Sequence, residues 1–351
     1  MSANLNTFEN IPIEQRNIDL APYNTLGVQA KAQIFYSIAE AEQLKALYNE
    51  GLFRKKSPFI LGGGSNILIK SDLKQPVLKI LIPGIEVIDV NDREVWVKAG
   101  AGVVWHDLVR FCVENGYGGI ENLALIPGTT GAAPIQNIGA YGVELKDVFQ
   151  SLSAFMPETG NMKVFNAEEC KFGYRDSVFK NQLKGKVIVT DVTLRLEKGP
   201  HKIEDSYYAL RKYFESENVT QPTIQDVFDA VVSIRRSKLP DPALIGNAGS
   251  FFKNPIVSKE VYENLKNEFS DIPSFPADQN RVKIPAGWLI EQAGWKGKKV
   301  GNVGTYKNQA LVLVNHGGAT GEEVYEHAMN IQESVKSLFG IELVPEVNVI
   351  E

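Results

Sequence analysis

Cysteine is scarce in this sequence, with two residues, Cys112 and Cys170, in a chain of 351. They form no CxxC pair, so neither a zinc site nor a disulfide framework is indicated. The four histidines are scattered along the chain, without the clustering that metal ligands require. We therefore expect no metal site, and two cysteines without a disulfide framework fit a protein in a reducing compartment.

Positive charge is also in short supply. The chain has 37 Lys and Arg against 42 Asp and Glu, a net charge of -5 and no long basic run, so broad nucleic-acid binding is disfavoured. The first 15 residues contain acids and lack a continuous apolar core, which is unlike a secretory signal. We expect a globular cytoplasmic protein whose partners include neither nucleic acid nor a membrane.

Charge is missing altogether from residues 122–143, NLALIPGTTGAAPIQNIGAYGV, although 23% of the whole chain is charged. About twenty apolar residues can cross a bilayer, but Pro127 and Pro134 remove amide donors and four glycines make a helix costly. We expect an irregular, ordered backbone of small residues, which lets a flat ligand approach amides that are free to donate hydrogen bonds. A flavin ring is the best candidate, and a tightly packed core loop is the alternative.

A second glycine-rich segment, GGGSN at residues 62–66, follows a short apolar strand expected over 59–61. Three consecutive glycines followed by Ser65 and Asn66 can direct several amides at one anion, as a pyrophosphate cradle does. The segment lacks the GK[ST] ending of a nucleotide-hydrolase loop and the GxGxxG spacing before a crossover helix. A pyrophosphate cradle and a tight structural turn therefore both fit it.

Hydrophobic periodicity predicts a mixed order of helices and strands. The clearest helix opens at Pro222 and Thr223 and stops before Pro240, in the KLPDP segment at 238–242 that we expect to mark a domain boundary. Other helices are expected over residues 37–51, 105–115, 259–269, 288–293 and 322–339. Strands are expected over residues 77–82, 86–90, 94–99, 152–156, 163–165, 187–196, 309–314 and 343–350, and a glycine-rich turn over 246–250.

Eight segments, taken in order, resemble the UDP-N-acetylenolpyruvoylglucosamine reductase family, also called UDP-N-acetylmuramate dehydrogenase. They are NTLGV (24–28), LGGGSN (61–66), GIENLALIPGTTGAAPIQNIGAYGVE (119–144), FGYRDSVFK (172–180), KLPDP (238–242), GNAGSFFKNP (246–255), AGWLIEQAG (286–294) and LVPEV (343–347). The resemblance therefore covers almost the whole chain.

This resemblance implies an α+β protein with an FAD-binding fold of the vanillyl-alcohol-oxidase (PCMH) type. Two FAD-binding subdomains are expected over residues 1–84 and 85–237, and an α+β substrate-binding domain over 238–351, whose last strand returns to the FAD site. FAD is expected to be non-covalent, because the glycine loop lacks the histidine that some relatives in the wider fold use for covalent attachment. The FGYRDSVFK segment and a tyrosine-containing loop imply the longer form of the family, in which a tyrosine closes over the substrate.

The implied reaction is the NADPH-dependent reduction of UDP-N-acetylglucosamine enolpyruvate to UDP-N-acetylmuramate, a precursor of peptidoglycan. Hydride passes through FAD to the enolpyruvyl group, and a proton is added to its other carbon. Ser250 matches the family's proton donor, and Arg175 matches the arginine that holds the substrate carboxylate. Glu346 matches the third active-site residue, which in its protonated form can donate a hydrogen bond to the enolate. The enzyme is expected to be a monomer.

Binding residues carry over from the same motifs. The expected FAD contacts are Gly62, Gly63, Gly64, Ser65, Asn66, Pro127, Gly128, Thr129, Gly131, Ala132, Gln136, Asn137, Ile138 and Gly142. The expected UDP-sugar contacts are Tyr174, Tyr207, Lys238, Asn254 and Gln309, with Tyr208 as the alternative to Tyr207.

Two other functions are compatible with a flavin-binding sequence. The first is an FAD-dependent oxidase of the same fold, against which the YRDS, GSFFKN and PEV segments argue. The second is a non-catalytic flavin or nucleotide-sugar sensor, which needs the cradle but no proton donor. NADPH oxidation that depends on UDP-N-acetylglucosamine enolpyruvate separates all three functions.

Overall fold

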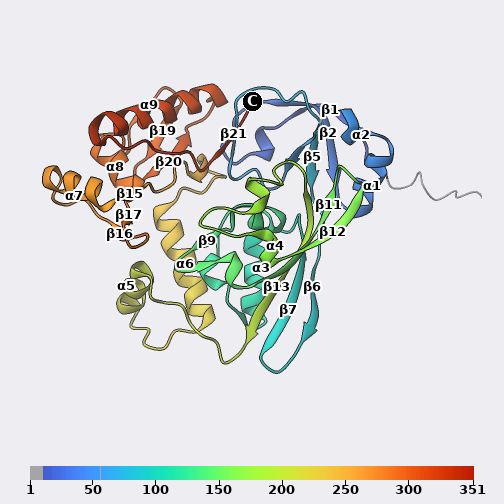
Figure 1. Cartoon of the computed structure of the whole chain (residues 1–351), viewed down its shortest axis with the longest axis horizontal. Helices are drawn as coiled ribbons and strands as arrows, with labels where there is room; N and C mark the ends of the chain where they lie inside the picture. Colours follow the sequence, from blue (N-terminus) through green and yellow to red (C-terminus); the bar gives the residue numbers. More distant parts are fainter. Residues whose placement is uncertain (1–10, 56) are drawn as a thin grey trace, which may run out of the picture. The chain divides into compact units, whose positions relative to one another are not determined.

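The computed structural model describes residues 11–55 and 57–351 (Figure 1). They divide into two compact units. The first unit holds residues 11–18, Ala32–Gly63 and Leu73–Arg235, and the second holds Asp19–Lys31, Gly64–Asp72 and Arg236–Glu351. The chain therefore passes between the units five times, at residues 18/19, 31/32, 63/64, 72/73 and 235/236.

A four-stranded sheet opens the first unit. Its order is β1 (Gln15–Asp19), β2 (Lys31–Ile38), β5 (Val77–Ile80) and β3 (Phe59–Leu61), and α1 (Ala41–Asn49) and α2 (Leu52–Lys55) lie between β2 and β3 in the chain. Strands β2 and β3 both pair with β5 in parallel. The helix predicted from residue 37 begins later, because Ser37 belongs to β2 and the capping box is formed by Glu40 and Gln43.

A larger antiparallel sheet forms the rest of the first unit. Its order is β12 (Asn161–Asn166), β11 (Phe149–Met156), β13 (Ile188–Lys198), β7 (Glu94–Gly100) and β6 (Ile85–Val90), with β8 (Tyr117–Gly118) beside β13. The helices of this part are α3 (Trp105–Glu114), α4 (Ala167–Cys170), α5 (Tyr208–Glu217) and α6 (Ile224–Lys238).

Helix α6 shows why the sequence specifies this packing. Ile224, Val227, Val231 and Ile234 recur on one face and are all buried in the core of the first unit. Burying each such side chain contributes about 1.5 to 3 kcal/mol relative to leaving it exposed. The helix predicted after Thr223 is therefore confirmed.

The second unit contains a four-stranded antiparallel sheet, a three-stranded sheet and one parallel pair. The first has the order β14 (Gly246–Ser250), β20 (Gln309–Asn315), β19 (Val303–Tyr306) and β18 (Lys299–Val300), and the second β15 (Ile256–Ser258), β17 (Arg281–Lys283) and β16 (Phe275–Pro276). The pair is β4 (Ile67–Ile69) with β21 (Asn348–Ile350), and the helices are α7 (Lys259–Glu268), α8 (Ala286–Gln292) and α9 (Gly321–Phe339).

Two sequence predictions for this unit were wrong. Residues 246–250, predicted as a turn, form the strand β14, because Gly246 and Asn247 pair with β20 despite their low strand propensity. The strand predicted over 343–350 is confined to β21, since the preceding residues bond to 251–253 instead: the Lys253 amide donates to the Val344 carbonyl at 2.9 Å.

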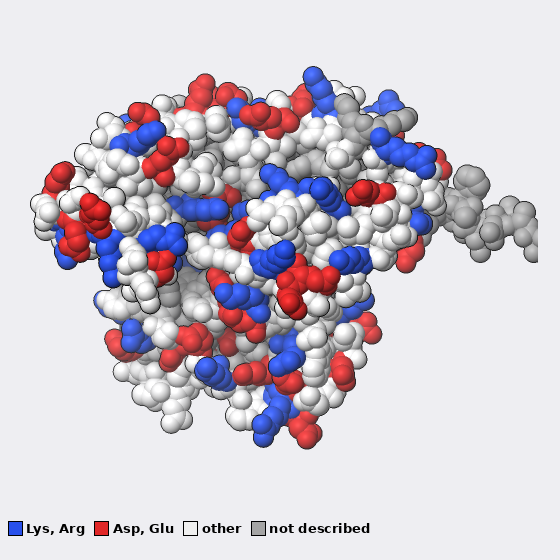
Figure 2. All heavy atoms as spheres, viewed as in Figure 1, with Lys and Arg blue, Asp and Glu red and all other residues white. Residues whose placement is uncertain are grey.

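Charged side chains of both signs are scattered over the face shown in Figure 2. Figure 2 shows Lys and Arg side chains interspersed with Asp and Glu over the face in view. Within residues 11–55 and 57–351, no helix combines the length and apolar character needed to span a membrane. The same residues contain no group of three or more His, Cys, Asp or Glu placed to hold a metal ion.

Candidate active site

The uncharged stretch has the irregular, ordered backbone that its composition predicts. Residues 121–144, which include this stretch, contain the 3-10 helices η2 (Glu121–Leu123) and η3 (Thr130–Gln136), followed by the short hairpin strands β9 (Gly139–Ala140) and β10 (Val143–Glu144). The backbone of the stretch is left-handed at Leu125, Asn137 and Tyr141, with φ of 56°, 45° and 48°. Such a path directs successive amides in different directions, as a surface that surrounds a ligand requires.

Main-chain hydrogen bonds fix this stretch to the segment that leads into α3. The Thr130 amide donates to the Val103 carbonyl at 2.8 Å, and the Gly131 amide to the Ala101 carbonyl at 3.0 Å. In return the Trp105 amide donates to the Gly128 carbonyl at 3.0 Å. These three hydrogen bonds therefore anchor the stretch within the first unit.

The glycine loop touches this stretch so closely that side chains are excluded. A Cβ on Gly63 would lie 2.8 Å from Gly128 Cα, and one on Gly62 would lie 2.9 Å from Thr129 Oγ1. The Lys79 ammonium donates to the Gly62 carbonyl, and burial lowers the pKa of Lys79. In the second unit Gly64 has a φ of 65°, and a Cβ at this position would overlap the Tyr23 carbonyl oxygen. Only glycine therefore fits there.

The exposure of these residues fits a flat cofactor. Pro127, Ala132 and Gly142 are exposed, although they belong to a stretch without a single charged side chain. Thr129 and Ile138 beside them are buried. A surface of small uncharged groups beside a glycine loop suits an isoalloxazine ring joined to a diphosphate, so the residues present fit FAD.

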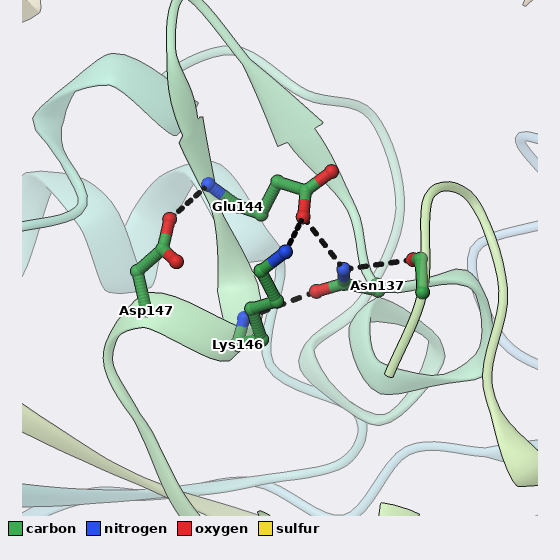
Figure 3. Close-up of polar contacts among 5 residues, drawn as sticks. Asn137, Glu144, Lys146 and Asp147 are labelled. Carbon is green, nitrogen blue, oxygen red and sulfur yellow. Dashed lines mark hydrogen bonds and ion pairs between the residues drawn. The ribbon is translucent and has the colours of Figure 1, made fainter. Parts of the chain in front are cut away.

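The Asn137 side chain makes hydrogen bonds within the protein. It is fully buried, and its Nδ2 donates to Glu144 Oε2 at 3.1 Å and to the Gly173 carbonyl at 3.0 Å (Figure 3). Its Oδ1 accepts from the Lys146 amide at 3.0 Å. These hydrogen bonds use both hydrogens and the oxygen of the side-chain amide. The FAD contact predicted for Asn137 would therefore involve its main chain, and it stays a prediction.

Arg175 lies in a tight turn beside the same stretch. The amides of Gly173 and Asp176 each donate to the carbonyl of the other, at 3.0 and 3.2 Å, and Arg175 between them has a φ of 52°. Its Nη2 donates to the Gly139 carbonyl at 2.6 Å, and its Cζ lies 5.6 Å from the centre of the Tyr174 ring. The predicted carboxylate-binding arginine is thus docked on the hairpin that ends the uncharged stretch.

Tyr207, which immediately precedes α5, contacts the uncharged stretch through its ring. The rings of Tyr207 and Tyr141 pack edge to face with centroids 5.3 Å apart, whereas Tyr208 lies on α5 with the Lys212 ammonium 5.1 Å from its ring. Asn122 Nδ2 ties the two segments together by donating to the carbonyls of Tyr141 and Glu204 at 2.9 and 2.8 Å. This arrangement places Tyr207, rather than Tyr208, against the uncharged stretch.

Sequence reasoning missed two residues of this region. Arg235 donates from Nε to the Leu125 carbonyl at 3.2 Å and shares a side-chain hydrogen bond with Tyr141. Asn122 Oδ1 is buried and has no hydrogen-bond partner among the residues that the structure describes. The charge of Arg235 at the end of α6 was the available signal, but it also suits an ordinary C-terminal helix position.

In the second unit the main chain brings Ser250 and Glu346 together. Ser250 is the exposed last residue of β14, and the amide of Glu346 donates to the carbonyl of the next residue, Phe251, at 2.8 Å. Asn66 Nδ2 donates to the Glu346 carbonyl at 3.3 Å. A predicted FAD contact, the predicted proton donor and the predicted glutamate therefore converge from three distant segments.

Two predicted UDP-sugar contacts meet at the start of α8. Asn254 Oδ1 accepts from the Ala286 amide at 2.9 Å. Gln309 begins β20, and a Cβ on Gly287 would lie 2.9 Å from its Oε1. Lys238 is exposed at the end of α6.

Comparison with known proteins identifies the family. The family described as FAD binding domain matches residues 32–166, and the one described as UDP-N-acetylenolpyruvoylglucosamine reductase, C-terminal domain, matches residues 241–350. The UDP-N-acetylenolpyruvoylglucosamine reductases of Flavobacterium johnsoniae and Amoebophilus asiaticus are each 48% identical to this chain, covering 96% of it and 99% of their own lengths.

A solved structure agrees with these relatives. The crystal structure of UDP-N-acetylenolpyruvylglucosamine reductase from Thermus caldophilus matches with a TM-score of 0.69 at 24% identity, over 97% of this chain and 100% of that one. The predicted α+β fold, an FAD-binding fold of the vanillyl-alcohol-oxidase type followed by a C-terminal domain, is confirmed. The chain belongs to the UDP-N-acetylenolpyruvoylglucosamine reductase family.

Proposed function

We propose that the protein reduces the enolpyruvyl group of UDP-N-acetylglucosamine enolpyruvate and so forms UDP-N-acetylmuramate for peptidoglycan synthesis. FAD is its cofactor and NADPH its reductant. One observation carries this function: reductases of that name match this chain at 48% identity over 96% of its length and 99% of theirs.

FAD, when bound, supplies the redox chemistry by accepting hydride from NADPH and passing it to the substrate. The chain supplies binding and orientation. The amides of the glycine loop would hold the diphosphate, and the uncharged stretch would receive the ring. The close approach of Gly63 to Gly128 supports this division, because it leaves main-chain groups rather than side chains at the surface.

Arg175 is proposed to bind the substrate carboxylate. A guanidinium is permanently charged and can donate two parallel hydrogen bonds to one carboxylate, which fixes both position and direction. The 2.6 Å hydrogen bond from Nη2 to Gly139 supports this role, since it holds the group beside the proposed flavin surface.

Ser250 is proposed to give its Oγ proton to the substrate carbon next to the carboxylate. A free hydroxyl is a weak acid, but an enolate carbon is basic enough to take its proton when the geometry is fixed. Glu346 would hold a hydrogen bond to the enolate oxygen, which stabilises the developing charge. The main-chain bond between Glu346 and Phe251 supports a joint role.

The remaining contacts are proposed for the UDP-sugar. Tyr207 would close over the substrate, with Tyr174 near Arg175, and Lys238, Asn254 and Gln309 would bind the nucleotide sugar. The packing of Tyr207 on Tyr141 supports its choice over Tyr208.

A steady-state assay tests the function as a whole. NADPH oxidation by the holoenzyme should require UDP-N-acetylglucosamine enolpyruvate and yield UDP-N-acetylmuramate. Substrate oxidation with oxygen consumption and no need for NADPH would instead show the oxidase. Tight binding of FAD or UDP-sugar without any turnover would show the sensor.

Ser250→Ala tests the proton donor separately. Rapid-mixing absorbance should show flavin reduction by NADPH at the wild-type rate, because no proton transfer from Ser250 is needed there. Flavin reoxidation by the substrate should fall by about 100-fold to 10,000-fold, the usual contribution of a positioned acid. A variant that loses the reduction step instead, while reoxidation is retained, would refute the role of Ser250.

We further propose that the enzyme is a cytoplasmic monomer, with subdomains over 1–84 and 85–237, a substrate domain over 238–351 and a last strand that returns to the FAD site. Cys112 and Cys170 are buried and free, and burial raises the pKa of each thiol to about 12, which suits a reducing compartment.

The pairing of β21 with β4, just after the glycine loop, supports the return of the last strand. Light scattering of the purified protein tests the monomer.

A further inference from the structure

We propose that Asn137 is a positioning residue: its amide group fixes the turn formed by residues 173–176 and so sets the direction of Arg175. This inference rests on the proposed function, in which Arg175 binds the substrate carboxylate. It assigns Asn137 a task within the protein, distinct from the FAD contact expected from the sequence motif.

The hydrogen bonds of the amide group are specific to asparagine. Both Nδ2 hydrogens are used, one by Glu144 Oε2 and one by the Gly173 carbonyl, while Oδ1 accepts from the Lys146 amide (Figure 3). An aspartate would lose both donors and face the Glu144 carboxylate. An apolar residue would leave the Gly173 carbonyl without its Asn137 donor.

The backbone of Asn137 also explains the residue type. Its φ of 45° lies in the left-handed region, which asparagine tolerates better than most residues. Arg175 adopts φ of 52° without that tolerance, because an arginine has no short side chain to bond its own backbone. The turn therefore depends on contacts from outside to hold Arg175 in this conformation.

Side chains on both sides of the turn supply these contacts. On the side that faces solvent, Lys180 Nζ donates to the Arg175 carbonyl at 3.3 Å, and Asn181 Nδ2 donates to Asp176 Oδ1 at 2.9 Å. On the side that faces the protein interior, Asn137 Nδ2 donates to the Gly173 carbonyl. Asn137 is fully buried, so water competes less for its hydrogen bonds than for the exposed bond of Asn181.

Asn137 also links the turn that carries Arg175 to the hairpin that Arg175 contacts. Arg175 docks on the Gly139 carbonyl, and Gly139 pairs with Glu144 across the hairpin. Asn137 holds Glu144 with one hydrogen and the Arg175 turn with the other. Glu144 is held in turn by the Lys146 ammonium at 2.6 Å. One amide therefore fixes the distance between the turn that carries Arg175 and the hairpin that receives its guanidinium.

Asn137→Ala in the holoenzyme tests this arrangement, with Asn181→Ala as the matched control on the exposed side of the same turn. Flavin reduction by NADPH should stay near the wild-type rate in both variants. Flavin reoxidation by the substrate should fall by about 10-fold to 100-fold in Asn137→Ala, the loss typical of a small misplacement of a positioning group. Asn181→Ala should retain the wild-type rate of reoxidation.

Amide hydrogen exchange supplies a readout that does not depend on turnover. The Asp176 amide, which donates to Gly173, should exchange about tenfold faster in Asn137→Ala as the turn loosens. Unchanged exchange would refute the inference. Equal loss of both flavin half-reactions together with loss of FAD would also refute it, because it would make Asn137 a cofactor contact or a purely structural residue.

The Arg175→Ala background separates this inference from the proposed function. If Asn137 acts through Arg175, adding Asn137→Ala to Arg175→Ala should slow reoxidation no further, whereas independent action gives a second loss of the same size. If Arg175→Ala alone reoxidises normally, the proposed role of Arg175 fails, and the exchange of the Asp176 amide still decides the structural part. Should Asn137→Ala fail to fold, Glu144→Ala removes one acceptor of the amide and should show a smaller, equally selective loss, and an unchanged reoxidation rate in that variant would refute the inference.

Discussion

His327 shows how a single buried group can set the pH range of stability. It lies on α9 with 4% of its surface exposed, its ring edge to face with Trp295 at 5.1 Å and its Nε2 3.4 Å from Thr305 Oγ1. Burial, with the nearby charge of Lys298, lowers the pKa of His327 to about 4. The folded protein therefore holds a neutral imidazole where the unfolded chain binds a proton near pH 6.5.

The pH dependence follows from that difference. Because the folded pKa lies below the unfolded one, the contribution of His327 is complete above pH 6.5 and is lost as the pH falls toward 4. Between pH 7 and 5 the wild type should lose about 1 to 2 kcal/mol of unfolding free energy through this group. Urea unfolding of His327→Gln should show a flatter profile. Parallel profiles for the two proteins would contradict the prediction.

Asn137 shows what could not be predicted from the uncharged stretch at residues 122–143. The motif located the stretch that contains Asn137, because a run of small uncharged residues is visible in the sequence. It did not reveal that the Asn137 side chain turns inward to Glu144 and Gly173, since Gly173 lies 36 residues away. Which atoms of a motif face a ligand depends on tertiary contacts of this kind.

At the scale of elements, helices with both a periodic face and end signals were predictable. Helix α9 was predicted over residues 322–339 and begins one residue earlier, at Gly321. In the structure Thr320 and Glu323 form a capping box, and Gly340 ends the helix with a φ of 66°. The strand β14 was missed, because its sequence GNAGS has none of the usual strand formers. Its pairing with β20 overrides local propensity.

The capping box of α9 gives a prediction at this scale. Thr320→Ala removes the side chain that accepts from the Glu323 amide, so it should destabilise the protein by about 1 kcal/mol. Thermal unfolding should report a midpoint about 1 to 3 °C lower. Ser337→Ala, an exposed change inside the same helix, is the control and should leave the midpoint unchanged or slightly higher. Equal midpoints for Thr320→Ala and the wild type would refute the contribution of the cap.

At the scale of the whole molecule, the division of the chain could not be predicted. The KLPDP segment lies close to the crossing at residue 235/236, but the other four crossings bound two short segments, Asp19–Lys31 and Gly64–Asp72. The partners of these segments are remote in sequence: Asn315 Nδ2 donates to the Leu26 carbonyl at 2.9 Å, and β21 pairs with β4. No local pattern carries that information.

A truncation tests the consequence of this division. A chain that stops at Arg235 keeps the glycine loop but lacks every partner that residues 236–351 provide for the two short segments. We expect this fragment to bind FAD at least about 100-fold more weakly than the full chain, because ordering the free segments opposes binding. Fluorescence titration with FAD measures the difference. A fragment with the affinity of the full chain would show that the short segments need no partner.

The pairing of β4 with β21 also affects the order in which the parts of the chain can fold. A ribosome releases residues 67–69 long before residues 348–350, so β4 must wait for almost the entire chain before its strand partner exists. Until then, β4 lacks the strand with which it pairs in the folded protein. Residues 348–350 complete the pair that begins just after the glycine loop, so we expect the segment behind this loop to reach its folded form only after residue 350 has been made.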